Sequence, residues 1–388
     1  MDVMRSAFAR QASGQDVLHM EVGEPGTPAP AAARAAAAAA LDGRPIGYTE
    51  AMGIPALRQA IAAHYQRTQG VAVDPQRICV TAGSSAGFIL GFSAAFDPGD
   101  RVGLAAPGYP CYRHILTALG LTAVSIPVGR ETRFQPTPET IEAAEARDGK
   151  AIDGLIVASP SNPTGSMLLP EEFGRLATWC RARAIRLVSD EIYHGITYER
   201  PAVSILALPR RGLAGAGADG AAGGAADGAI VVNSFSKYFS MTGWRLGWLV
   251  LPPELIRPVE CLAQNYFISA PTLSQIAAVA AFDATEELEG HVRTYARNRA
   301  ILWDALKRAG IADVAPPDGA FYLYADVGHL TNDSLDFCRR LLAETGIAIT
   351  PGLDFDPERG SRTIRFSFAG PTAVVEQVAE RFERWVRR

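Results

Sequence analysis

Long hydrophobic runs are missing from this sequence. Every apolar stretch is interrupted by charge or proline well before the roughly 20 residues that a membrane-spanning helix needs, and residues 1–6 lack the apolar segment of a secretory signal. Blocks of like charge are missing as well, because 37 Lys and Arg residues against 41 Asp and Glu residues give a net charge of only −4. We therefore expect no membrane span, no nucleic-acid partner and no binding to a charged membrane surface.

Cysteine and histidine are scarce and scattered. The five cysteines form no Cys-x-x-Cys pair, and their odd number argues against a disulfide framework. The six histidines show no spacing typical of metal ligands. We therefore expect no metal site and a reducing compartment, which favours a cytoplasmic location. An apolar fraction of 48% and a charged fraction of 20% are ordinary for a globular enzyme.

The order of elements predicts an α/β fold. From about residue 55 to 285, helical stretches alternate with short β-rich runs. Such alternation is typical of crossover units, which build a mostly parallel sheet flanked by helices on both faces. The candidate strands lie at 77–81, 101–104, 122–126, 154–158, 185–189, 230–232 and 246–250.

A second, smaller domain is expected at the C-terminal end. Residues 286–388 begin with a long helical stretch and continue with a mixed α+β pattern that includes the candidate strands 320–324 and 363–367. At 388 residues the chain is long enough for two domains. We predict a large domain over 45–285 and a discontinuous small α+β domain built from 1–44 and 286–388.

Residues 210–228 are rich in glycine and alanine and contain almost no large side chain. Such a segment has little surface to bury when it folds. Its surroundings do not indicate a phosphate loop either, because no strand leads into it and no helix start follows. We predict a surface loop here.

The most informative stretch is the segment 233–248, which carries one lysine, Lys237, between two serines, with Arg245 downstream. The candidate strand 230–232 precedes it, so Lys237 should lie on a loop at the carboxyl end of a strand, where open α/β sheets bind ligands. A lysine there can form a Schiff base with a carbonyl group, or it can simply extend to water as a surface residue. On this residue alone both interpretations remain open.

Seven further motifs, in order along the chain, decide between them. They are Val22-Gly-Glu-Pro-Gly26, Tyr48-Thr-Glu-Ala-Met-Gly53, Thr81-Ala-Gly-Ser-Ser-Ala-Gly87, Pro107-Gly-Tyr-Pro110, Ser159-Pro-Ser-Asn-Pro-Thr-Gly165, Ser189-Asp-Glu-Ile-Tyr193 and Ile364-Arg-Phe-Ser-Phe368. With the lysine segment they resemble class I pyridoxal phosphate-dependent aminotransferases, the aspartate aminotransferase-like enzymes of fold type I. The resemblance runs from about residue 17 to the C-terminus. It implies the cofactor pyridoxal 5'-phosphate and ping-pong transfer of an amino group from an L-amino acid to a 2-oxo acid.

The resemblance also implies roles for individual residues around the cofactor ring. Lys237 would hold the cofactor as a Schiff base and then move the proton at the substrate Cα. Asp190 would pair with the pyridine nitrogen, and Tyr109 would stack on the ring. Tyr193 and Asn162 would hydrogen-bond to the phenolic oxygen of the cofactor.

The phosphate group and the substrate have candidate residues as well. The start of a helix after the strand 77–81 offers backbone N–H groups to an anion. The resemblance assigns the phosphate to Gly83, Ser84, Ser85, Ser234, Ser236 and Arg245, with Tyr48 reaching over from the neighbouring chain. That last role implies a homodimer with shared active sites. Arg365 would clamp the substrate carboxylate beside Asn162, and Gly23 would lie in the loop that closes over the substrate.

Two questions stay open at this point. The segment 263–270 carries Tyr266 and Phe267 where many relatives have a polar stretch, which favours a neutral or apolar substrate side chain over a dicarboxylate. The same apparatus also serves other reactions, so a pyridoxal phosphate-dependent C–S β-lyase or amino-acid decarboxylase is the alternative to an aminotransferase. A non-enzymatic effector domain of a transcription regulator would need a winged-helix domain ahead of Val22, where the sequence leaves no room for one.

Overall fold

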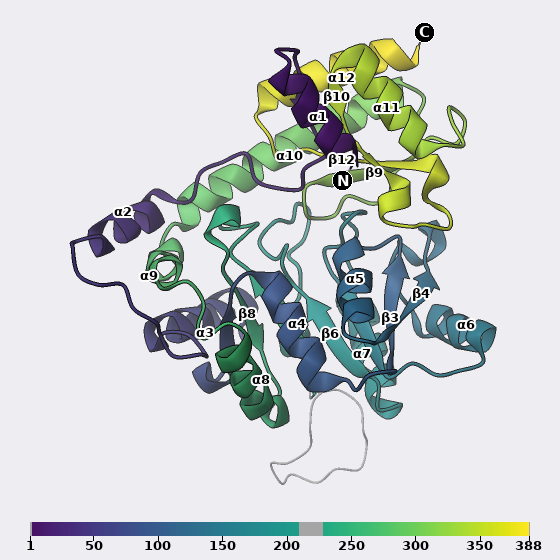
Figure 1. The fold of residues 1–388 in the computed structure, drawn as a ribbon. Helices are drawn as coiled ribbons and strands as arrows, with labels where there is room; N and C mark the ends of the chain where they lie inside the picture. The colour runs from purple at the N-terminus through teal and green to yellow at the C-terminus, as the bar shows by residue number, and fades with distance from the viewer. Residues whose placement is uncertain (1, 209–227, 388) are drawn as a thin grey trace.

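The computed structural model describes residues 2–208 and 228–387 (Figure 1). The predicted surface loop at 210–228 therefore lies outside the described residues, except for Gly228. A seven-stranded sheet with the order β2-β8-β7-β6-β5-β3-β4 forms the centre of the larger part of the molecule. Its strands are β2 Ile78–Thr81, β3 Arg101–Ala106, β4 Thr122–Pro127, β5 Gly154–Ala158, β6 Arg186–Asp190, β7 Ile230–Ser234 and β8 Gly247–Val250.

This sheet is mostly parallel, which confirms the predicted fold class. Parallel ladders join β4 to β3, β3 to β5, β5 to β6 and β6 to β7. Within the sheet, β8 alone runs against its neighbours β2 and β7. The candidate strands match the observed ones to within about two residues at their ends, which is the usual uncertainty of a strand boundary.

Helices cover both faces of the sheet, so the strands need apolar side chains on both sides. Successive strand residues point to opposite faces. Leu155 and Val231 accordingly join one core, whereas Ile156 and Val232 join the other. The first face is covered by α3 Pro55–Gln69, α6 Pro138–Asp148, α7 Pro170–Ala182 and α9 Thr272–Ala281, and the second by α4 Ser84–Ala95, α5 Pro110–Ala118 and α8 Pro253–Tyr266.

The smaller part, at the top of Figure 1, has the α+β character that the sequence predicts. A three-stranded antiparallel sheet of order β11-β12-β9 packs with helices around a separate core that is rich in phenylalanine, including Phe321, Phe366 and Phe382. Its strands are β9 Tyr322–Asp326, β11 Thr350–Pro351 and β12 Thr363–Ser367. Its helices are α10 Thr285–Arg308, α11 Ser334–Thr345 and α12 Thr372–Val386.

The N-terminal segment divides between the two parts. Helix α1 (Asp2–Ala12) contacts α11, and β1 (Leu18–His19) pairs in parallel with β10 (Ile347–Ala348), so both join the smaller part. Helix α2 (Ala31–Ala40) instead packs on α9, with Ala33 and Ala37 buried in a core of the larger part. This differs from the predicted grouping of residues 1–44, because small alanine side chains let α2 lie close against α9. The domain boundaries themselves stay a prediction.

The remaining helices are short 3-10 turns: η1 Pro75–Arg77, η2 Arg130–Thr132, η3 Ile205–Ala207, η4 Thr242–Trp244, η5 Gly352–Asp354 and η6 Gly360–Arg362. Across residues 2–208 and 228–387, no helix is both long and apolar enough to cross a membrane. In the same residues, His, Cys, Asp and Glu side chains form no group of three or more that could hold a metal ion.

The strand ends bring polar residues to one edge of the large sheet. Strand β6 ends at Asp190, β7 ends at Ser234, and α4 begins at Ser84 shortly after β2. The carboxyl ends of parallel strands meet at one edge, which is where open α/β sheets bind ligands. In Figure 1 this edge faces the smaller part of the molecule.

Candidate active site

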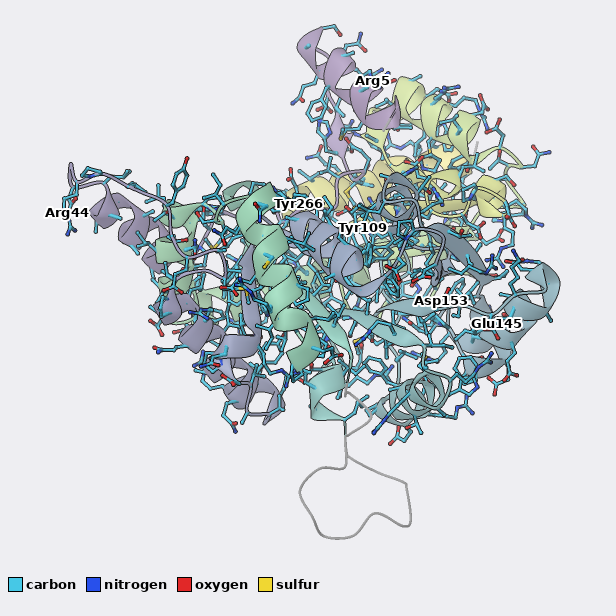
Figure 2. All side chains as sticks on the ribbon, turned by 60° about the horizontal axis from the view of Figure 1, so that its bottom comes forward. Arg5, Arg44, Tyr109, Glu145, Asp153 and Tyr266 are labelled. Carbon is cyan, nitrogen blue, oxygen red and sulfur yellow. The ribbon has the colours of Figure 1, made fainter. Side chains whose placement is uncertain are left out.

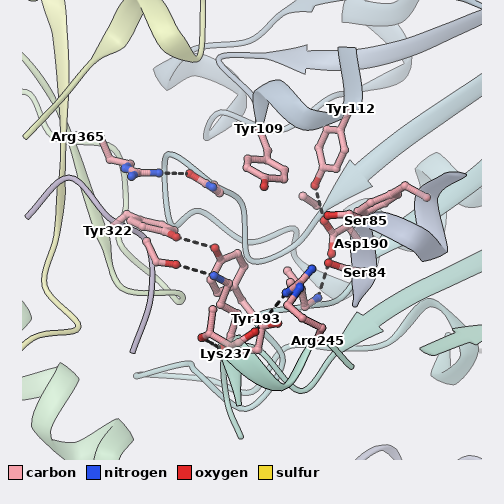
Figure 3. Close-up of a pocket in the computed structure, with 17 residues that line it drawn as sticks. Ser84, Ser85, Tyr109, Tyr112, Asp190, Tyr193, Lys237, Arg245, Tyr322 and Arg365 are labelled. Atoms are coloured by element: carbon pink, nitrogen blue, oxygen red, sulfur yellow. Dashed lines mark hydrogen bonds between the residues drawn. The ribbon is translucent and has the colours of Figure 1, made fainter. Parts of the chain in front are cut away.

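A cavity of about 300 Å³ opens between the carboxyl edge of the large sheet and the smaller part (Figure 3). Its lining comes from β6, from the turns after β5 and β7, from the starts of α4 and α5, and from β9 and β12. Of the predicted site residues it brings together Gly23, Ser84, Ser85, Tyr109, Asn162, Asp190, Tyr193, Ser236, Lys237, Arg245 and Arg365. Gly83, Ser234 and Tyr48 do not line it.

Lys237 lies in the turn that follows β7 and points into the cavity. Its Nζ donates a hydrogen bond to the backbone oxygen of Gly23 at 2.5 Å. The pKa of Lys237 is lowered to about 8, mainly by burial, with Arg365 and Arg245 acting in the same direction and the carboxylates of Glu24 and Asp190 acting against it. The amine is therefore easier to deprotonate near neutral pH than an exposed lysine, as nucleophilic or proton-accepting lysines require.

Asp190 is the last residue of β6 and is almost fully buried. Its Oδ2 accepts a hydrogen bond from the hydroxyl of Tyr112, and its Oδ1 accepts one from the backbone N–H of Ile192 at 3.1 Å. Burial raises the pKa of Asp190 to about 6, although these two hydrogen bonds act in the opposite direction. Among the described residues no cation forms an ion pair with it, so the carboxylate has an unmet need for positive charge.

The start of α4 and the turn after β7 together form a candidate anion site. Ser84 and Ser85 are the first residues of α4, where backbone N–H groups are unpaired and the helix dipole is positive. Gly83, just before them, has φ +80°, and a Cβ there would lie 2.4 Å from Nη2 of Arg245. Gly83 thus makes room for the guanidinium. Ser236 supplies a further hydroxyl to the cavity.

Ser234 lies one layer behind this anion site. Its side chain is fully buried, and its hydroxyl oxygen lies 2.9 Å from that of Ser236 and accepts a hydrogen bond from the Ser236 backbone N–H at 3.0 Å. The sequence places Ser234 at the phosphate itself. In the structure Ser234 does not line the cavity but holds Ser236, which does, so a contact of Ser234 with the phosphate stays a prediction.

Arg365 is buried in β12, and its guanidinium is not neutralised by any carboxylate among the described residues. Its Nη1 donates to Oδ1 of Asn162 at 2.8 Å, and its Nη2 donates to the backbone oxygen of Glu21 at 2.7 Å and to Oγ1 of Thr350 at 3.2 Å. All of these acceptors are uncharged. A buried cation without a counterion is costly unless an anion joins it, so Arg365 is available to bind one.

Tyrosines surround the centre of the cavity. Tyr109, just before α5, stands with its ring edge-on to that of Tyr112, at 5.4 Å between ring centroids. The hydroxyls of Tyr193 and Tyr322 lie 2.6 Å apart in a hydrogen bond that either can donate. The ring of Tyr322 also lies under the guanidinium of Arg365, with 4.4 Å from its centroid to Cζ.

The cavity contains residues that the sequence did not single out, namely Phe88, Tyr112, Ala158, Ile192, Thr242 and Tyr322. For Tyr112 a signal existed, because it follows Tyr109 by three residues at the start of a helix and such neighbours share a face. Tyr322 lies in the predicted strand 320–324, but the sequence does not reveal that β9 pairs with β12 and so lies beside Arg365.

Tyr48 lies outside the cavity of its own chain and is 81% exposed. Tyr266, labelled in Figure 2, is the last residue of α8 and is also well exposed. The segments of these two residues lie together, because the backbone N–H of Thr49 donates to Oγ of Ser269 at 3.3 Å. Ile46 and Ile268 are further large apolar side chains exposed on these segments.

Known proteins resemble this chain over nearly its whole length. The family described as aminotransferase class I and II matches residues 15–382. The valine–pyruvate aminotransferase of Mycobacterium tuberculosis is 50% identical over 388 residues, which cover 100% of this chain and 95% of that protein. The crystal structure of an aminotransferase from Mycobacterium tuberculosis matches with a TM-score of 0.91 at 49% identity, covering 100% of this chain and 96% of the other. The Thermus thermophilus aspartate aminotransferase with maleate matches with a TM-score of 0.88 at 30% identity, covering 99% and 95%.

Proposed function

Because this chain belongs to the family of class I and II aminotransferases, we propose that it moves the amino group of an L-amino acid with a neutral side chain to a 2-oxo acid, using pyridoxal phosphate held on Lys237. Transamination itself follows from the family. The assignment of the site rests mainly on one observation. Arg365 is a buried guanidinium without a counterion, and it shares one cavity with Lys237 and Asp190.

The residues of the cavity fit pyridoxal phosphate. Asp190 offers a buried carboxylate that lacks a cation, which a protonated ring nitrogen would supply. The start of α4, with its serines, and Arg245 offer a site for a doubly charged phosphate group. Lys237 offers a buried amine whose pKa is lowered to about 8. The donor set therefore matches the aldehyde, the ring nitrogen and the phosphate of the cofactor separately.

Pyridoxal phosphate, when bound, supplies an electron sink that stabilises negative charge at the substrate Cα. The chain's own residues supply the rest. Asp190 keeps the ring nitrogen protonated, because a carboxylate in a buried site favours the charged partner. Lys237 accepts the proton from the substrate Cα on Nζ and later returns one, which an amine with a pKa of about 8 can do near neutral pH. Arg365 grips the substrate carboxylate with both arms of its guanidinium and so fixes the direction of the Cα–H bond.

The charges of the cavity favour a substrate with a neutral side chain. The cations among its described lining residues are Lys237, Arg245 and Arg365, and each already has a task in the proposal. A second carboxylate on the substrate would find no further cation there, and burying it unpaired would be costly. Tyr266 and Phe267 do not line the cavity of their own chain, so the cavity itself carries this argument. The Mycobacterium tuberculosis relative, named for valine and pyruvate, supports the same choice.

We propose that the active form is a homodimer. The exposed side chains of Ile46, Tyr48, Tyr266 and Ile268 lie on two neighbouring segments and offer apolar surface to a second copy. In such a dimer Tyr48 reaches the phosphate of the neighbouring site, as in the resemblance drawn from the sequence. All five cysteines are free thiols, which supports a reducing compartment, and we place the protein in the cytoplasm.

The first experiment separates transamination from its alternatives. The protein is loaded with pyridoxal phosphate, and L-valine, L-alanine and L-aspartate are added singly without any 2-oxo acid. We expect L-valine or L-alanine to abolish the visible absorption band, and pyruvate to restore it. Release of ammonia or carbon dioxide with each turnover would instead support the β-lyase or the decarboxylase. Efficient reaction of L-aspartate without reaction of the neutral amino acids would contradict the proposed substrate class.

A further inference from the structure

The two residues that would grip the substrate carboxylate and the phenolic oxygen of the cofactor are joined by a third, Tyr322. It lies in β9, next to the strand that carries Arg365, and only 1% of its side chain is exposed. Its ring supports the guanidinium of Arg365, and its hydroxyl bonds to that of Tyr193. No motif pointed to Tyr322, yet it contacts both residues at once (Figure 3).

Two aromatic rings support Arg365. The Cζ atom of Arg365 lies 4.4 Å from the ring centroid of Tyr322 and 4.7 Å from that of Phe355. Two rings at these distances attract the cation and restrict its movement. The position of Arg365 is thus fixed by aromatic rings rather than by an acid, which leaves its charge available for a carboxylate.

The loop that carries Gly23 depends on the same tyrosine. A Cβ on Gly23 would lie 2.2 Å from the hydroxyl oxygen of Tyr322, so no larger residue fits while that hydroxyl stays in place. The backbone oxygen of Gly23 in turn accepts the hydrogen bond from Lys237. Tyr322 therefore contacts the loop that holds the amine, as well as Arg365 and Tyr193.

The hydrogen bond between the two tyrosines has a direction once the cavity is filled. A hydroxyl has one hydrogen to donate and can also accept. If Tyr193 donates its hydrogen to an acceptor in the cavity, the bond between the tyrosines persists only with Tyr322 as the donor. A donor that itself accepts a hydrogen bond is polarised and donates more strongly. The cation over the ring of Tyr322 makes that tyrosine the better donor of the pair.

We propose that Tyr322 is a positioning residue of this active site, whose ring holds Arg365 for the substrate carboxylate and whose hydroxyl directs the hydrogen of Tyr193 to the phenolic oxygen of the cofactor. This inference rests on the proposed function. Tyr322 would contribute in two separable ways, through its ring and through its hydroxyl. A different substitution tests each contribution.

The hydroxyl is tested with Tyr322→Phe, and the readout is the pH at which the visible absorption band of the loaded protein titrates. A weaker donor to a negatively charged oxygen makes that oxygen hold its proton more tightly. We expect the midpoint to rise by about 0.5 pH unit. Tyr193→Phe should raise the midpoint further. Adding Tyr322→Phe to Tyr193→Phe should produce no additional shift, because the hydroxyl of Tyr322 acts through that of Tyr193, which is then absent.

Tyr324→Phe is the matched control. Tyr324 lies two residues further along β9, is equally buried, and its hydroxyl makes a hydrogen bond of 2.6 Å to Oγ1 of Thr363, the same length as that of the tyrosine pair. It does not line the cavity. Both variants should lower Tm by a similar amount, whereas the midpoint of the absorption band should move in Tyr322→Phe alone. An equal shift in Tyr324→Phe, or no shift in Tyr322→Phe, would overturn the inference.

The ring is tested with Tyr322→Leu, using propionate as a carboxylate probe and its dissociation constant as the readout. Tyr322→Phe keeps a ring under Arg365 and should bind propionate like the wild type. Tyr322→Leu should bind it roughly three- to tenfold more weakly. Equal affinities in the two variants would overturn this half of the proposal. A wild-type protein that shows no visible band with pyridoxal phosphate would refute the proposed function and this inference together, whereas a wild-type band with an unchanged Tyr322→Phe would refute this inference alone.

Discussion

Asp190 shows how a functional residue can weaken the protein that carries it. In the folded chain, burial raises the pKa of Asp190 from 3.8 to about 6. The folded state therefore binds the proton more tightly than the unfolded state does. Stability that depends on this group is fully present below pH 3.8 and is lost as the pH rises through about 6. Keeping the ionised carboxylate ready for a cation costs stability in the cofactor-free protein.

Asp190→Asn should therefore stabilise the cofactor-free protein at pH 8, by about 2–3 kcal/mol, and leave its stability at pH 4 nearly unchanged. The amide keeps the size of the side chain and can still bond to Tyr112 and Ile192, but it carries no charge. Urea unfolding at the two pH values measures the effect. Glu191, whose pKa burial raises to about 7, also raises the pKa of Asp190 by charge repulsion, so relief of that repulsion is part of the measured difference.

The same substitution should stabilise the cofactor-free protein but lower the activity of the protein loaded with pyridoxal phosphate. Asparagine cannot pair with a protonated ring nitrogen, so the variant should lose at least a hundredfold in kcat while its cofactor-free form is the more stable protein. A variant that is less stable than the wild type without cofactor at pH 8 would contradict this account of Asp190.

Arg365→Lys tests the two-armed grip on the substrate. Lysine keeps the positive charge but offers a single ammonium group instead of the planar fork, and it cannot reach Asn162 and a substrate carboxylate in the same geometry. We expect KM for the amino acid to rise roughly tenfold to a hundredfold, with a smaller change in affinity for pyridoxal phosphate. Steady-state kinetics and a cofactor titration measure the two effects. A variant that loses cofactor affinity and keeps its KM would place Arg365 in a different role.

For single residues, the sequence predicts the position in the fold where the neighbouring residues along the chain determine it. Asp190 is the last residue of the buried strand β6 and Lys237 lies in the turn after β7, so the strand ends fix their positions in the fold. Tyr322 gains its surroundings from β12 and from the loop at Gly23, which are distant in sequence. Ser234 shows the reverse case, because its motif marks it as a phosphate ligand but its neighbours in the sequence do not reveal that its hydroxyl bonds to Ser236 and stays outside the cavity lining.

Among the helices and strands, the start of α4 requires one particular residue, a glycine at position 83. Gly83 precedes the helix with φ +80°, and a Cβ there would collide with the guanidinium of Arg245. Gly83→Ala should therefore displace Arg245 from the anion site and weaken binding of pyridoxal phosphate at least tenfold. Titration of the cofactor-free protein with pyridoxal phosphate, followed by absorbance, measures this loss.

Gly149→Ala is the matched control for that substitution. Gly149 ends α6 with φ +68° and ψ 18°, so alanine also meets positive-φ strain there, although less than at Gly83, where ψ is 166°, and nothing lies within 4 Å of its Cβ position. Gly149→Ala should lose roughly 1 kcal/mol of stability, and Gly83→Ala should lose more. Only Gly83→Ala should lose cofactor affinity, and an equal loss in Gly149→Ala would mean that strain alone explains the result.

The positions of helices and strands were predictable where the residues of an element show by their own polarity how it is buried. Strands β5 and β7 consist of apolar residues because both faces of the sheet are covered, and their positions follow from the sequence. The sequence of α2 does not predict which element it packs against, because a run of alanines can pack against any close surface. Its association with α9 depends on the path of the chain through residues 41–54, which no local pattern specifies.

At the scale of the whole molecule, charged contacts tie the two parts together around the cavity. Asp318 of the smaller part accepts hydrogen bonds from Arg133 at 2.6 Å and from Arg200 at 3.3 Å. Arg299 of α10 pairs with Glu199 and stacks on the ring of Tyr198. These contacts hold β9, and with it Tyr322, against the carboxyl edge of the large sheet. The site thus depends on how the parts meet as much as on either part.

The proposed dimer extends this dependence to a second chain, and mixed dimers can test it. Lys237→Ala removes the reactive amine from its own site, and Tyr48→Phe removes the hydroxyl that should serve the neighbouring site. In a dimer of one chain of each kind, one site then carries both defects and the other carries neither. We expect activity to reappear when the two inactive or weakened proteins are unfolded together and refolded as a mixture.

The alternative predicts the opposite result. If Tyr48 served the site of its own chain, every site in the mixed dimer would keep one defect, and mixing would restore nothing beyond the sum of the separate proteins. The exposure of Tyr48, at 81% in the single chain, favours a role across the interface, because a large aromatic side chain gains most by being covered. Mixing Lys237→Ala with Arg365→Lys is the control, since both act within one chain and the mixed dimer then has no intact site.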